Sequence, residues 1–433
     1  MKISKFQIIF LAIFVAFIIA GVTAFATYRG TATSTQLPPI TIWGTYPKTA
    51  FDSYVAKVNL TLPQQFSIKY VQESEQSFLK DFIAALARGN GPDAILVPAD
   101  MLLSTEDKLT VVPYSAFPQK DFVNSFIDEA RVYIGSSGLL GIPFSVDPLV
   151  MYWNRDTFNA AGIAVPPKTW DELKAINSKI TQKDDNGTIS RSTVAMGDFT
   201  NVENAREILG TLILQTGNPI TKIYAENDVR STLQPSASAG LVPAVSLFTN
   251  TVNPADPAYS WNRSWPNSRT AFLSGKLATY FGLASELFGI RNKNPNLNFD
   301  VAPIPQVKNA NISATYGKLH GFSITKASPN ANAAFQMIYV LTLPSNLAML
   351  STDTYLPSVS RSVIAQGSTD AYLSQFNEQA LISRTWLDAD PTQSFALFAS
   401  MISSITSGQK PLYQAISDMS NQYDVILRSA FGQ

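Results

Sequence analysis

A long uncharged segment near the N-terminus divides this chain into two parts. From Phe6 to Thr27 no residue carries a charge, and Lys2 and Lys5 precede the segment. A helix needs roughly 20 apolar residues to cross the ~30 Å hydrocarbon layer of a membrane. Because positive residues stay on the cytoplasmic side, residues 1–30 are predicted to be a membrane anchor or signal segment, with the body outside the cytoplasm.

The end of this segment leaves cleavage open as an alternative. Ala24, Phe25 and Ala26 have the small-x-small pattern of a signal-peptidase site, and cleavage near Ala26 would give a secreted protein. The uncharged run is longer than the ~7–15 apolar residues of an ordinary signal peptide, which favours an uncleaved helix in the cell membrane. Residues 31–39 are rich in Thr, Ser and Pro and are predicted to be a linker.

Composition excludes several classes of protein. With 45% hydrophobic and 15% charged residues over 433 positions, the chain can bury a large core, which excludes disorder. It has no cysteine and one histidine, His320, so thiolate or multi-histidine metal sites are excluded. The formal net charge is zero and no basic block is present, so no nucleic acid partner is expected. We predict no metal site and no cofactor.

Short apolar strands alternate with helical patterns in the body. Ile40–Trp43 alternates as a strand does, and apolar residues recur at helical spacing from Phe78 to Leu86. Ala94–Val97 is a short apolar run typical of a buried parallel strand. This order of strand, helix and strand predicts a βαβ unit.

The same alternation continues through the middle of the chain. Leu139–Phe144 and Leu149–Trp153 are predicted to be two strands, and Asn201–Leu214 a helix. Thr169 and Glu172 form a capping-box pattern at the start of another helix. The C-terminal hundred residues look helical. The fold class is therefore α/β with two lobes, and the crossings are expected near Ser145 and Pro303.

None of the catalytic motifs suggested by residue spacing has the neighbouring elements or residues that its chemistry needs. Gly89, Gly91 and Ala94 have a dinucleotide-type spacing but follow a helix and precede a strand, the reverse of what phosphate binding needs. A calcium-loop spacing that starts at Gln182 lacks its first and last carboxylates. His320 has no partner motif and is interpreted as a hydrogen-bonded structural or surface residue rather than a general base. We therefore predict no catalytic residue and no enzyme.

Four segments in a fixed order carry a family resemblance. They are Gly91–Val97, Gly141–Leu173, Ala271–Gly282 and His320–Phe335. The second resembles the hinge signature of extracellular solute-binding proteins of ABC importers, in particular the maltose- and sugar-binding type. The others resemble a first-lobe strand, a glycine-lysine segment and a later strand–helix crossing of that family. The resemblance extends over about residues 40 to 430.

The resemblance implies two α/β lobes, each built from two separated stretches of chain and joined by hinge strands. The first lobe would comprise 40–145 with 300–345, and the second 146–299 with 346–433. One solute, a sugar or oligosaccharide, would lie between the lobes. Closure around it would present a surface to a permease of an ABC transporter in the membrane, and a monomer is expected.

Aromatic faces and carboxylates are the side chains that suit a sugar, because they contact C–H patches and accept hydrogen bonds from hydroxyls. Asp147 stands in the hinge signature where the family contacts sugar hydroxyls. Leu283 and Ala284 depart from the family, which often has Trp there. Core packing remains an alternative for several of the aromatic candidates. The predicted ligand-binding residues are Trp43, Asp100, Asp147, Trp261, Ser285, Glu286, Trp386 and Phe395.

Two further functions remain alternatives from the residues alone. An exported glycoside hydrolase would use paired carboxylates, for which Asp147 and Glu286 are available. A sugar sensor without transport would keep the fold and the membrane helix.

Overall fold

The computed structural model describes residues 37–225, 228–236 and 239–431. The predicted anchor at Phe6 to Thr27 lies outside the described residues. The body forms one compact unit from Pro39 onward. Within the described residues, only a bent pair of helices, Ala331–Leu341 and Pro344–Thr354 at 66°, has the length and apolar composition of a membrane span, and no single helix does.

The N-terminal part of the sheet contains two consecutive β-α units rather than the single predicted one. Strand β1 (Ile40–Gly44) leads through α2 (Lys48–Thr61) to β2 (Ile68–Gln72). Helix α3 (Phe78–Ala87) then leads to β3 (Ala94–Pro98). β1 lies between β2 and β3 and is parallel to both. Only Tyr70 of β2 is buried, so this strand has a weak hydrophobic signal, which is why it was not predicted.

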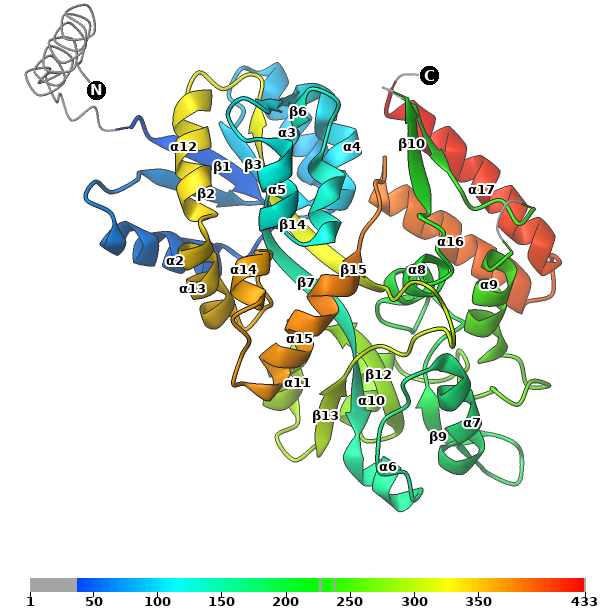
Figure 1. Cartoon of the computed structure of the whole chain (residues 1–433). Helices are drawn as coiled ribbons and strands as arrows, with labels where there is room; N and C mark the ends of the chain where they lie inside the picture. Colours follow the sequence, from blue (N-terminus) through cyan, green and yellow to red (C-terminus); the bar gives the residue numbers. More distant parts are fainter. Residues whose placement is uncertain (1–36, 226–227, 237–238, 432–433) are drawn as a thin grey trace, which may run out of the picture. The chain divides into compact units, whose positions relative to one another are not determined.

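One long strand joins the two lobes (Figure 1). The first half of β7 (Ile142–Asn154) pairs with β14 (Thr315–Thr325), and its second half pairs with β12 (Leu277–Leu283) and β13 (Phe299–Ala302). The prediction of two strands here was wrong. Pro148 lies where the partner of β7 changes, so its missing N–H interrupts no continuous ladder.

The main sheet has the order β2-β1-β3-β14-β7-β12-β9-β8, and β7 passes from the strands of one lobe to those of the other along its length. The other strands are β4 (Leu109–Thr110), β5 (Val112–Pro113), β6 (Gly138–Leu139), β8 (Gln182–Lys183), β9 (Ile189–Val194), β10 (Thr221–Ala225), β11 (Asp228–Ser231) and β15 (Ser383–Arg384). The helices between β3 and β14 are η1 (Ala99–Met101), α4 (Leu102–Thr105), η2 (Glu106–Lys108), α5 (Gln119–Ser125), η3 (Asp128–Tyr133), α6 (Arg155–Ala160), α7 (Trp170–Ile180), α8 (Ala205–Leu214), α9 (Leu241–Asn250), α10 (Ser268–Leu273) and α11 (Glu286–Lys293). Those after β14 are α12 (Ala331–Leu341), α13 (Pro344–Thr354), α14 (Arg361–Ile364), α15 (Ala371–Ile382), α16 (Pro391–Thr406) and α17 (Leu412–Ser429).

Segments far apart in the chain pack together within each lobe. In the second lobe, α16 contacts α8, and α17 contacts α9 and β11 (Figure 1). Closer to the N-terminal sheet, α13 contacts α2 and α14 contacts α5. Each of these contacts joins an early and a late stretch of the sequence.

Local capping explains where two of these helices begin. The hydroxyl of Thr169 accepts a hydrogen bond from the Glu172 N–H, which confirms the predicted cap of α7. α8 begins at Ala205 rather than at the predicted Asn201. Asn204 has a left-handed backbone with φ of 55°, and a helix cannot continue through it toward the N-terminus.

Aromatic residues fill the core of the first lobe. The buried ring of Phe144 on β7 contacts the rings of Tyr46, Phe51, Tyr54 and Phe322 at centroid distances of 5.0 to 6.0 Å. Edge-to-face aromatic pairs add about 0.5–1.5 kcal/mol each beyond their buried area. The hinge strand is thus held tightly to the first lobe before it crosses.

Candidate ligand-binding cleft

A cavity of about 630 Å³ lies between the lobes. Glu75 and Asp100 line it from the first lobe, and Lys318 lines it from the hinge strand β14. Arg206 and Glu207, at the start of α8, line it from the second lobe. Two other cavities have similar volumes of about 620 and 670 Å³, so volume alone does not identify the site. This cavity is distinguished by charged side chains from both lobes and from the hinge.

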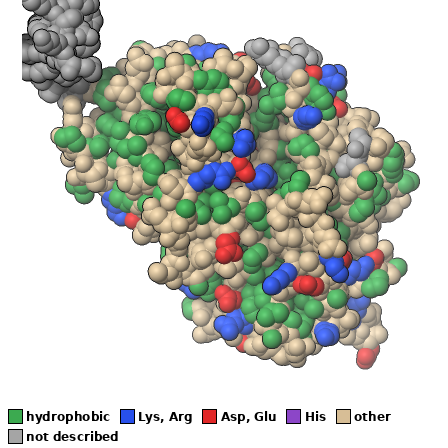
Figure 2. All heavy atoms as spheres, in the orientation of Figure 1, with side chains coloured by type: hydrophobic (Ala, Val, Ile, Leu, Met, Phe, Trp, Pro, Cys, Tyr) green, Lys and Arg blue, Asp and Glu red, His purple; other side chains and the backbone are tan. Residues whose placement is uncertain are grey.

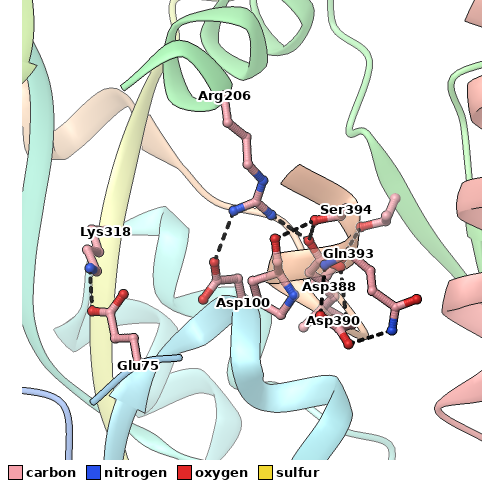
Figure 3. Close-up of polar contacts among 11 residues, drawn as sticks. Glu75, Asp100, Arg206, Lys318, Asp388, Asp390, Gln393 and Ser394 are labelled. Carbon is pink, nitrogen blue, oxygen red and sulfur yellow. Dashed lines mark hydrogen bonds and ion pairs between the residues drawn. The ribbon is translucent and has the colours of Figure 1, made fainter. Parts of the chain in front are cut away.

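A buried arginine forms the centre of the cleft (Figure 3). One nitrogen of Arg206 lies 2.5 Å from Asp388 Oδ2, and the other lies 3.5 Å from Asp100 Oδ2, across the interface between the lobes. The Arg206 side chain is 6% exposed and that of Asp388 has no exposed surface. Burial alone lowers the pKa of Arg206, but Asp388 and Asp100 outweigh burial and hold the pKa above its usual value.

Further contacts hold the guanidinium and its partners in place. The Ser394 hydroxyl donates to Asp388 Oδ2, and the Asp388 N–H donates to the Asp100 carbonyl at 3.3 Å. The indole of Trp386 lies under the guanidinium of Arg206, with 4.8 Å between the ring centroid and the guanidinium carbon. The Tyr316 ring contacts that indole edge-on, with 5.5 Å between the ring centroids. Stacking on an indole stabilises a cation by about 0.5–2 kcal/mol. Arg206 is therefore a rigid part of the cleft wall.

A second ion pair lies at the hinge side of the cleft. Lys318 Nζ lies 2.5 Å from Glu75 Oε1 (Figure 3). Burial lowers the pKa of Lys318, but Glu75 and the nearby carboxylates raise it by more, so the pKa stands above its usual value. Lys318 is also opposite Asp147 in the β14–β7 ladder, so the two side chains share one face of the sheet.

The predicted acids Asp147 and Glu286 support the cleft wall. Asp147 Oδ1 accepts a hydrogen bond from the Ser285 N–H at 3.0 Å, and burial raises the pKa of Asp147 to about 6, despite the Ser285 bonds that lower it. Glu286 accepts hydrogen bonds from the Leu283 N–H and the Asn204 side-chain amide. Both Leu283 and Asn204 line the cavity. These carboxylates therefore hold lining loops in position.

The structure brings some of the eight predicted residues together and separates others. Asp100 and Phe395 line the cleft, and Trp386 lies directly behind Arg206. Trp261 is fully buried, packs against the tilted ring of Trp265 at 5.0 Å and donates a hydrogen bond to Asn201, which favours a role in the core. Trp43 is half-buried within β1, where it pairs with neighbouring strands, and does not line the cavity.

Several lining residues were not predicted from the sequence. Arg206 and Glu207 belong to the mostly buried helix α8, and Lys318 belongs to the buried strand β14. A charged residue in an apolar element was the available signal, because such charges are rarely buried without a partner or a function. His320, two residues after Lys318, is buried in β14, so the surface position that the sequence left open is wrong. Burial lowers its pKa to about 3, and its ring contacts Tyr46.

The comparison with protein families identifies the group to which this architecture belongs. Residues 53–374, more than half of the chain, match the model for bacterial extracellular solute-binding proteins. The chain belongs to this family. The resemblance predicted from the four sequence segments is therefore confirmed.

Individual relatives agree with this assignment. A maltooligosaccharide ABC transporter solute-binding lipoprotein of Streptococcus pneumoniae is 22% identical over 92% of this chain and 91% of its own. Among solved structures, the sugar-binding protein MalE from Xanthomonas citri has a TM-score of 0.73 at 18% identity and covers 92% of this chain and 100% of its own. A cyclic alpha-maltosyl-1,6-maltose binding protein from Arthrobacter globiformis has a TM-score of 0.71 at 19% identity, over 90% and 99% of the two chains. The predicted two-lobed fold is confirmed by these neighbours.

Proposed function

We propose that this solute-binding protein captures a carbohydrate between its lobes and delivers it to the permease of an ABC importer. The observation that carries the proposal is the cleft between the lobes, with ion-paired side chains from both lobes and from the hinge. Its volume of about 630 Å³ falls within the ~300–1,000 Å³ of typical small-molecule sites. The names of the relatives given above support a sugar as the ligand.

The chemistry of the cleft suits a polyhydroxyl compound. The carboxylates of Asp100 and Glu207 accept hydrogen bonds, and the guanidinium of Arg206 donates them. Tyr316 and Phe395 provide ring surfaces for the C–H patches of a sugar, and the Phe395 side chain is exposed and held against Phe199. We propose these five residues as the ligand contacts.

The remaining predicted residues have supporting roles in this proposal. Asp147, Ser285 and Glu286 position the lining loops, and Trp386 positions Arg206. We propose the lobe boundaries expected from the sequence, 40–145 with 300–345 and 146–299 with 346–433, with one extension. Because α14 contacts α5, we assign the late stretch of the first lobe through Ile364 rather than through residue 345.

We also propose that the body lies outside the cytoplasm as a monomer and that residues 1–30 anchor it to the cell membrane. The uncharged segment with Lys2 and Lys5 before it supports the anchor. The family description supports the extracellular body. No catalytic reaction is proposed, so a bound oligosaccharide should be recovered intact after incubation with the protein.

Thermal denaturation of the full-length chain tests the proposal. The protein would be purified in a detergent without a sugar head group and heated with neutral and amino oligosaccharides, amino acids and polyamines. A ligand that binds only the folded state stabilises it by about 2.7 kcal/mol at a hundred times its dissociation constant. We expect a shift with at least one saccharide, and a smaller shift for Asp100→Asn. Stabilisation by amino acids or polyamines alone would contradict the proposal.

A further inference from the structure

The charges in the cleft do not balance. Lys318 is paired with Glu75, so this pair contributes no net charge. Around Arg206 lie three carboxylates, those of Asp100, Asp388 and Glu207. One guanidinium against three carboxylates leaves a net charge of about −2 at the base of the cleft. The remaining charged residues of the lining, Lys80 and Asp390, have opposite charges and leave this sum unchanged.

Glu207 is the member of this group that is free to meet a ligand. It follows Arg206 on the first turn of α8 and lines the cavity. Within the described residues, its carboxylate accepts no hydrogen bond from another residue; its own backbone N–H faces it, and the nearby cations are Arg206 and Lys318. Asp388, by contrast, is fully buried and bonded to Arg206 and Ser394.

The surroundings of Glu207 favour a positively charged partner. Burial raises its pKa, and the neighbouring Asp100 adds to this rise, although Arg206, its own backbone N–H and Lys318 oppose it. The ionised carboxylate is therefore only partly compensated by the protein's own groups. A cationic group at this place would compensate it, whereas an anionic group would add repulsion to a site that is already negative.

Resting on the proposed function, we infer that the preferred ligand is a saccharide with a protonated amine, which Glu207 binds directly while Asp100 faces it from the other lobe. An ammonium group donates up to three hydrogen bonds, so it can reach both carboxylates at once. Contacts to both lobes are what closes a two-lobed binding protein on its ligand. Glu207 is then the residue that selects for charge, and uronic acids are excluded.

Calorimetric titration with matched sugars tests this inference. The full-length chain, in a detergent without a sugar head group, would be titrated with two pairs: glucosamine and N-acetylglucosamine, and chitotriose and its tri-N-acetylated form. Each pair differs in the charge on nitrogen. Galacturonic acid and its trimer would serve as anionic probes. The variants would be Glu207→Gln and, as a matched control, Glu203→Gln. Glu203 lies four residues earlier, binds Asn267 and does not line the cavity.

The expected result is a preference of at least about tenfold for the free amines, which corresponds to about 1.4 kcal/mol, because hydrogen bonds to charged groups are stronger than those between neutral groups. Glu207→Gln should reduce that preference to within about threefold, while Glu203→Gln retains it. Equal affinity for amine and acetylated forms, or an unchanged preference in Glu207→Gln, would overturn the inference and leave the proposed function standing. Binding of none of these sugars, nor of neutral oligosaccharides, would overturn both. Melting temperatures of the variants show whether each is folded.

Discussion

Replacing Arg206 by Met is the sharpest test of how the cleft is held together. The substitution keeps much of the volume of the side chain but leaves Asp388, which has no exposed surface, without its partner at 2.5 Å. Removing one member of a buried pair costs about 3–5 kcal/mol, because the remaining charge is buried and uncompensated. The substitution also removes the stacking on Trp386, which contributes about 0.5–2 kcal/mol, less than the loss of the ion pair.

Chemical denaturation of a double-mutant cycle measures this effect. The four proteins are the parent, Arg206→Met, Asp388→Asn and the double variant, and the free energies of unfolding are compared. Because the two side chains are in direct contact, we expect a coupling of about 2 kcal/mol or more, and the double variant should be more stable than Arg206→Met. Lys48 and Asp52 are the control pair: their side chains are 50% and 48% exposed, so their coupling should stay below about 1 kcal/mol.

The pH dependence adds an independent check. In Arg206→Met the unpaired Asp388 is buried, so its pKa in the folded protein should lie above the unfolded value. The folded state then binds more protons, and the variant should regain stability as the pH falls toward 4. Additive effects of the two substitutions, within about 0.5 kcal/mol, together with no gain at low pH, would refute the assignment of a buried, energetically coupled ion pair.

Two further predictions concern the hinge and the first lobe. Burial raises the pKa of Glu129 to about 8, although its bond from the Ser383 hydroxyl and the charge of Arg384 lower it. Its folded pKa lies above the unfolded value, so its contribution to stability should be present below pH ~4.5 and lost as the pH rises through 8. Glu129→Gln should flatten that slope in denaturation curves recorded from pH 5 to 9, and an unchanged slope would contradict this. Phe144→Ala should lower the free energy of unfolding by about 3–5 kcal/mol through the cavity left among four aromatic rings, and a loss below 1 kcal/mol would show that the core collapses around it.

Much of the candidate site could not be predicted from the sequence, for a physical reason. Asp100 was found because it follows a short buried strand, and polar residues at strand ends collect at one edge of a sheet. Arg206 and Glu207 gave no such signal. Periodicity places them on a helix, but what they face depends on a segment near Asp388, which lies 182 residues from Arg206 in the chain.

The prediction for Asp147 was only partly informative. Its motif places it correctly in the hinge strand, yet the structure uses its carboxylate to hold Ser285, a residue 138 positions away. Trp261 shows the opposite difficulty, since it was predicted to bind the ligand and is fully buried. Local sequence does not reveal which distant backbone closes over a side chain.

The sequence by itself determined the uncharged N-terminal segment, the α/β class, most of the strands and helices it was used to predict, and the four segments that identify the family. These features depend on neighbouring residues, because charge, periodicity and capping act over a few positions. Only the tertiary structure decided that β7 is continuous through Pro148, that Arg206 reaches both Asp100 and Asp388, and that Glu207 faces the cavity. Those outcomes depend on contacts between distant stretches, whose geometry is set when the two lobes pack around the hinge strands.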